Sequence, residues 1–96
     1  MSNDTFESVW DAIEETPEQA ENMKVRSQLM MILTAHIEKN KITQAQAARV
    51  FGVTQPRISD LVRGKISVFS IDMLVNMLAS ADMHISKIEI SQKATA

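Results

Sequence analysis

Residues 43–63, TQAQAARVFGVTQPRISDLVR, constrain the fold of this chain more than any other stretch. Thr43 and Gln46 have the spacing of a capping box, in which each side chain bonds the other residue's backbone N–H at the start of a helix. Gly52 predicts the end of that helix, because glycine adopts a left-handed conformation at little cost. Thr54 predicts the cap of another helix directly afterwards. The stretch therefore predicts two short helices joined by a tight turn.

The second of these helices is expected to present an almost entirely polar surface. Ile58, Leu61 and Val62 recur at the i, i+3 and i+4 spacing that marks the buried stripe of a helix. The residues outside that stripe are Gln55, Pro56, Arg57, Ser59, Asp60 and Arg63. A tight turn followed by an outward-facing polar helix is a helix-turn-helix, which places its second helix in the major groove of duplex DNA.

This stretch resembles the lambda-repressor-like, or Xre, helix-turn-helix proteins. The resemblance rests on seven residues at the spacing of that family: Gln44, Ala48, Gly52, Val53, Gln55, Ile58 and Leu61. It implies an all-α fold, a lambda-repressor-like bundle of about five helices, and sequence-specific binding to double-stranded DNA. The alternative interpretation of the same residues is an ordinary helical hairpin in some other bundle.

The resemblance also implies which side chains contact DNA. Base edges are expected to be read by Gln55, Pro56, Arg57, Ser59 and Asp60, of which the glutamine can offer its amide to adenine as a bidentate pair. Phosphates are expected to be bound by Gln44, Arg49, Thr54, Arg63 and Lys65, which position the protein without specifying a sequence. The carboxylate of Asp60 is repelled by phosphate unless it accepts a hydrogen bond from a cytosine or pairs with Arg57 or Arg63.

Charge is divided unevenly along the chain. The formal net charge of −2 argues by itself against a nucleic-acid partner. However, residues 1–23 hold seven acids and no base, whereas residues 24–65 hold eight bases and two acids. A phosphate backbone responds to this local excess of cations, within a Debye length of roughly 8 Å.

Residues 1–15 predict a short, acidic, amphipathic helix. Phe6, Val9, Trp10 and Ile13 fall at the i, i+3, i+4 and i+7 positions of one helical face. One interpretation is that this stripe packs on the protein's own domain. The other is that it binds a protein partner, because an apolar centre with a carboxylate rim suits a basic surface.

A long helix is predicted to follow this acidic segment. Thr16 is expected to cap it, with Pro17 at its first position, and the helix is expected to run to about Asn40. His36 is expected to be packed or half-exposed rather than to bind metal, because no second ligand stands at metal-binding spacing. Residues 16–82 are expected to form a helical bundle within a single domain of 96 residues.

The C-terminal part of the chain predicts a contact between two copies. Ser70 is expected to cap a further helix, and residues 84–91, HISKIEIS, then change to a strand-like pattern. A lone β-strand leaves its backbone groups unpaired, so a second copy related by a two-fold axis is expected to pair with it. The expected dimer contacts are Met73, Met77, Met83, Ile85, Ile88 and Ile90. A homodimer predicts an operator that is an inverted repeat.

Several classes of function are not indicated. The chain has no cysteine, and it lacks a glycine-rich phosphate loop, a zinc-protease motif and a nucleophile elbow. An enzyme, a cofactor and a metal site are therefore not expected. The first basic residue is Lys24 and no long apolar run occurs, so neither a signal peptide nor a membrane span is expected. The expected location is the cytoplasm, at the nucleoid when DNA is bound.

Over residues 6–91 the chain is also similar to the HigA-type antitoxins within the Xre family. The similarity is carried by the acidic head, the long helix, the TQPR and VRGK segments at 54–57 and 62–65, and the strand pattern. It implies an antitoxin that represses its own type II toxin–antitoxin operon and neutralises a small basic ribonuclease toxin. A toxin contact is then expected at Phe6, Val9, Trp10 and Ile13. The alternatives are a stand-alone Xre-type repressor and a protein-interaction module that does not bind DNA.

Overall fold

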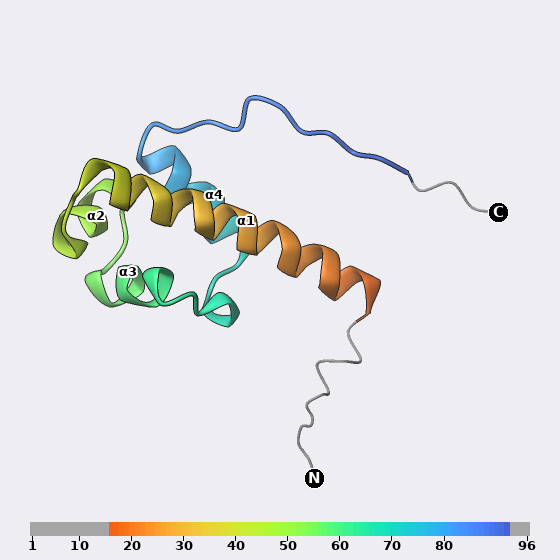
Figure 1. Ribbon diagram of the computed structural model, residues 1–96, viewed down its shortest axis with the longest axis horizontal. Coiled ribbons are helices and arrows are strands. Elements are labelled where there is room, and N and C mark those ends of the chain that lie inside the picture. Colours follow the sequence, from red (N-terminus) through yellow and green to blue (C-terminus); the bar gives the residue numbers. More distant parts are fainter. Residues whose placement is uncertain (1–15, 93–96) are drawn as a thin grey trace, which may run out of the picture.

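The computed structural model describes residues 16–92, and these residues form an all-helical bundle. In Figure 1, the long first helix crosses the molecule and the shorter helices gather around its C-terminal half. The elements are α1 (Pro17–Asn40), α2 (Gln44–Phe51), α3 (Gln55–Val62), the 3-10 turn η2 (Ile66–Val68) and α4 (Ile71–Ser80). None of the described helices combines the length and the apolar character needed to cross a membrane.

The ends of α1 confirm the sequence prediction. The hydroxyl of Thr16 accepts a hydrogen bond from the Gln19 N–H at 3.1 Å, and the Gln19 side chain accepts from the Thr16 N–H at 3.0 Å. Pro17 follows at the first helical position, where no intrahelical partner for an N–H is lost. Lys41 ends the helix in the left-handed conformation, with φ at 53°.

The caps of α2 and α3 also form as predicted. Thr43 and Gln46 complete a reciprocal capping box, with hydrogen bonds of 3.1 and 2.8 Å. Gly52 ends α2 with φ at 70°, a conformation that other residues adopt only at a cost. The hydroxyl of Thr54 accepts from the Arg57 N–H at 3.3 Å and so begins α3.

One apolar core joins the four helices. Its largest fully buried side chains are Phe51, Phe69, Leu33, Ile58, Leu61, Leu74 and Met77. The ring of His36 packs on this core, with its centroid 5.8 Å from that of the Phe51 ring. The prediction that Val62 is buried is wrong, because this side chain lines an open groove beside Met31 of α1 and remains 37% exposed.

The predicted C-terminal β-strand is wrong. Residues 83–92 have no regular secondary structure, and Ile85, Ile88 and Ile90 are exposed. The alternation of side chains is not sufficient for a strand, because a ladder also needs the N–H and C=O groups of a neighbouring strand. Residues 16–92 contain no such neighbour. They contain four α-helices, and the fifth helix expected within residues 1–15 lies outside the described part of the chain.

Candidate nucleic-acid interface

The turn between α2 and α3 fixes these helices against each other. The Val53 N–H donates to the carbonyl oxygen of Ala48 at 3.0 Å, which closes the turn after Gly52. Ala47 and Ala48 are both buried at this junction, where small side chains let two short helices approach closely. The pair therefore forms the compact helix-turn-helix unit that the sequence predicts.

The outward side of α3 carries polar residues, as expected. Ile58 and Leu61 are 0% and 1% exposed and face the core. On the opposite side, Gln55 and Pro56 are exposed at the start of the helix, and Ser59 is half-buried one turn later. These three predicted readout residues thus share the part of α3 that faces away from the core.

The predicted phosphate contacts lie around this surface. Thr54, Arg49, Arg63 and Lys65 are exposed, and Gln44 is half-buried in the first turn of α2. The backbone at the start of α3 adds little to them, because Pro56 has no N–H and the N–H of Arg57 is bonded to Thr54. The exposed side chains of this set are available to a ligand in the surrounding solvent.

Arg57 departs from the predicted readout surface. Its guanidinium turns back toward the protein, where Nη1 donates to the carbonyl oxygen of Val68 at 3.0 Å. The guanidinium carbon also lies 5.6 Å from the centroid of the Phe69 ring, within cation–π range. In this conformation the side chain is half-buried and its donors are not directed with those of Gln55.

Asp60 lies between two of the predicted phosphate contacts. Its Oδ1 is 3.7 Å from Nη2 of Arg63 and 3.8 Å from Nζ of Lys65. Pairing with Arg63 is one of the two arrangements that make a carboxylate tolerable near phosphate. The pairs are long and their cations are at least half exposed, so both cations remain free to turn toward solvent or DNA.

The predicted dimer residues separate into two groups. Met77 is only 1% exposed, because α4 turns this side chain into the core of its own chain, so it offers no surface for the expected dimer contact. Met73 and Met83 are half-buried and pack against the same core. Beyond them, the exposed fraction increases along the segment, from 48% for Ile85 to 72% for Ile88 and 88% for Ile90. The predicted toxin-binding residues Phe6, Val9, Trp10 and Ile13 lie outside the described residues.

Sequence reasoning missed Arg26, which is linked to the loop after α3. Its Nη1 donates to the carbonyl oxygens of Ile66 and Phe69 at 3.0 and 3.3 Å. These partners are 40 and 43 residues away in the chain, so no local sequence pattern predicts the contact. The only available signal was an arginine close to the apolar stripe of α1.

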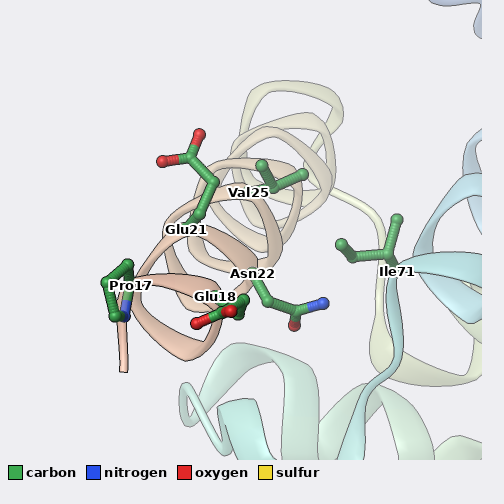
Figure 2. A pocket seen from close by; sticks show the side chains of 6 residues that line it. All are labelled: Pro17, Glu18, Glu21, Asn22, Val25 and Ile71. Atoms are coloured by element: carbon green, nitrogen blue, oxygen red, sulfur yellow. The ribbon is translucent and has the colours of Figure 1, made fainter. Parts of the chain in front are cut away.

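Figure 2 shows a shallow hollow between the N-terminal part of α1 and Ile71 at the start of α4. Val25 and Ile71 supply apolar side chains to it, and Glu18 and Glu21 supply carboxylates. The hollow has a volume of about 640 Å³ and is completed by Pro17 and Asn22. No residue of α2 or α3 lines it, so it is separate from the outward surface of α3.

The fold and the outward surface of α3 define a DNA-binding helix-turn-helix domain of the kind found in transcription regulators. The chain belongs to the helix-turn-helix domain family, whose model matches residues 12–91. It is also similar to a solved structure named as an XRE family transcriptional regulator, with 29% sequence identity and a TM-score of 0.70. That match covers 80% of this chain and 90% of the other. No curated protein matches the chain significantly. The resemblance to the Xre helix-turn-helix proteins is thereby confirmed.

Proposed function

We propose that the protein is a sequence-specific repressor that inserts α3 into the major groove of duplex DNA. The observation that carries this proposal is the two-sided character of α3. Its apolar residues Ile58 and Leu61 are buried, while Gln55 and Pro56 stand exposed at its N-terminal end. The N-terminal residues of a recognition helix are the ones that reach base edges.

Each side chain has a distinct proposed role at the groove. The amide of Gln55 pairs with N6 and N7 of an adenine, and the hydroxyl of Ser59 bonds a second base edge. Pro56 has no donor and contacts a thymine methyl group. The proposed phosphate contacts are Gln44, Arg49, Thr54, Arg63 and Lys65, which fix the register of the protein on the duplex.

Operator selection from a random duplex library tests the proposal. The wild-type protein should enrich one sequence, and Gln55→Ala should cost about 1 to 3 kcal/mol of operator binding and relax one base position. Gln28→Ala is the matched control, because this glutamine is exposed on α1 outside the helix-turn-helix. An unchanged consensus for Gln55→Ala would remove this residue from the readout, and the absence of any enriched sequence would refute the repressor.

Binding as a homodimer is part of the proposal. The support for it is the apolar surface of the C-terminal segment, where Ile85, Ile88 and Ile90 are exposed next to the half-buried Met83. Water contact with several large aliphatic side chains is unfavourable, and a second copy of the same segment can cover them. A two-fold dimer then presents two α3 helices to half-sites about 34 Å apart in an inverted repeat.

A second proposed function is that of an antitoxin which represses its own toxin–antitoxin operon. It is supported by the charge of residues 1–23, which hold seven acids and no base, and by the hollow on α1. That hollow combines apolar and acidic side chains in the same way, with Val25 and Ile71 beside the carboxylates of Glu18 and Glu21. An apolar centre with an acidic rim suits a small basic protein such as a ribonuclease toxin.

Removal of residues 1–15 separates this second function from DNA binding. The shortened protein should retain operator affinity, because all proposed DNA contacts lie in residues 44–65. It should lose neutralisation of a basic toxin encoded beside it, and the emission of Trp10 in the full chain should shift when that toxin is added. Equal neutralisation by the shortened and full-length proteins would contradict the role of residues 1–15. The absence of a basic partner would leave a stand-alone repressor.

A further inference from the structure

Two arginines from different helices hold the connector between α3 and α4. Arg26 of α1 donates through Nη1 to the carbonyl oxygens of Ile66 and Phe69, at 3.0 and 3.3 Å. Arg57 of α3 donates through Nη1 to the carbonyl oxygen of Val68 at 3.0 Å. Three carbonyl groups of residues 66–69 therefore accept from guanidinium groups, which form stronger hydrogen bonds than neutral donors.

The two guanidinium groups are themselves held in place. Nε of Arg26 donates to Oδ1 of Asn22 at 2.7 Å, one turn earlier on α1. The guanidinium of Arg57 lies over the ring of Phe69, and that ring is only 2% exposed. A planar group fixed by a hydrogen bond and by an aromatic face loses most of its rotational freedom.

Burial explains only part of the position of the connector. Within η2, Ser67 and Val68 are exposed and Ile66 is half-buried, so this turn has no buried residue. Its backbone bonds are all local, with the Ile66 N–H bound to Gly64 at 2.8 Å, the Val68 N–H to Lys65 at 3.2 Å and the Phe69 N–H to Ile66 at 3.3 Å. Phe69 anchors one end of the connector in the core and Ile66 packs against the core at the other end, while the arginine contacts hold the backbone between them.

Placement of the connector matters for α3 because this helix is short. It has eight residues, and only Ile58 and Leu61 are fully buried, so beyond its contact with α2 few packing contacts set its orientation against the rest of the bundle. Arg57 lies in its first turn and Val68 lies after its C-terminal end, so their hydrogen bond joins the two ends of one closed stretch of chain. Arg26 ties the same stretch to α1.

We propose that Arg57 is a positioning residue for DNA recognition and does not read a base. With Arg26 it holds the connector, and through the connector it sets the orientation in which α3 presents Gln55 and Ser59 to the major groove. This inference rests on the proposed DNA binding. Sequence specificity then depends on two arginines whose side chains keep their hydrogen bonds to the connector when the operator is bound.

Binding of each variant to the selected operator and to a scrambled duplex tests the proposal, at a temperature where every variant is fully folded. Arg26→Met and Arg57→Met keep an apolar stem but no donor, and each should lower the ratio of operator to scrambled affinity about tenfold. The consensus sequence that each variant selects and the salt dependence of binding should not change. In the double variant, the loss in the logarithm of this affinity ratio should be smaller than the sum of the losses in the two single variants, because both residues act on one connector. Arg57→Lys, which keeps the charge and a donor, should recover part of the ratio.

Arg49→Met is the matched control, because this exposed arginine is a proposed phosphate contact. It should weaken both duplexes alike and lower the log–log salt slope by about one. A different selected consensus for Arg57→Met, or an unchanged affinity ratio for Arg26→Met, would overturn the positioning role. A wild-type protein that binds both duplexes equally would instead overturn the proposed function.

The side-chain NMR signal of Arg57 gives an independent measurement on the wild-type protein. In the free protein its Hε resonance should carry a ring-current shift from Phe69, which Phe69→Leu should remove. The shift should persist after the operator is added. Its disappearance on binding, with a new contact to a guanine, would overturn the proposal and make Arg57 a base-reading residue.

Discussion

The hydroxyl of Ser80, at the end of α4, donates a hydrogen bond of 2.9 Å to the carbonyl oxygen of Val50 near the end of α2. Oγ of Ser80 also lies 3.1 Å from the position that a Cβ atom on Gly52 would occupy. Ser80 therefore ties α4 to the turn of the helix-turn-helix and leaves no free space above Gly52. This link joins the last described helix of the bundle to the unit proposed to bind DNA.

Substitution of the two glycines should separate backbone strain from this close contact. Gly52 and Gly64 have nearly the same φ, at 70° and 72°, but a Cβ on Gly64 would meet no atom within 4 Å. Gly64→Ala should lower the free energy of unfolding by about 1 to 2 kcal/mol, the cost of a left-handed L-residue. Gly52→Ala should lower it further, because Ser80 must move. Urea denaturation measures both, and the difference should vanish in a Ser80→Ala background. Equal losses in the wild-type background would contradict the importance of the contact.

Neutralisation of Asp60 should strengthen DNA binding. Asp60→Asn frees Arg63 and Lys65 from a carboxylate 3.7 and 3.8 Å away and removes a charge that repels phosphate. The affinity for all duplexes should rise and the salt slope should steepen, while the free energy of unfolding changes by less than about 1 kcal/mol. Titrations at several salt concentrations measure the effect. Asp82→Asn is the control, since this exposed residue lies after α4. Weaker binding of Asp60→Asn, together with a changed base preference at a cytosine position, would show that Asp60 reads that base.

Two methionines on α4 should differ in their contribution to stability. Met77 is 1% exposed, and Met77→Ala should lower the free energy of unfolding by about 2 to 5 kcal/mol, since it leaves a cavity in the core. Met73 is half-buried, so Met73→Ala should cost clearly less. Chemical denaturation of the two variants compares these costs directly. A similar loss for both would indicate that α4 packs differently from the described structure.

The proposed dimer contact should depend on the exposed isoleucines. Ile88 and Ile90 are 72% and 88% exposed, so replacing either by Asp should not change the free energy of unfolding of the monomer. Each variant should nevertheless sediment as a monomer, because a charge cannot be buried in an apolar contact without a partner. Ser86→Asp adds the same charge to the same segment and should remain dimeric. Persistence of the dimer in both isoleucine variants would place the contact elsewhere.

The starts of all four helices were predictable from the sequence. Thr16, Thr43, Thr54 and Ser70 each accept a hydrogen bond from the N–H three residues later, at 3.1 to 3.3 Å. Such a bond forms between residues that are already close along the chain, so residue type and spacing are sufficient to predict it. The outward side of α3 was predictable for a related reason, since the buried stripe of one helix defines its opposite side.

The direction of individual side chains was decided only by the tertiary structure. Arg57 finds its acceptor 11 residues away and Arg26 finds one 43 residues away, distances over which sequence spacing carries no information. Met77 was assigned to the surface and lies in the core, because the packing of α4 against the other helices selects its buried side. The C-terminal isoleucines have the side-chain pattern of a strand but no strand beside them within residues 16–92. The sequence by itself therefore determined the helices and the class of protein, since both depend on local hydrogen bonds and periodicity. Tertiary packing decided which polar side chains remain exposed on the outward side of α3.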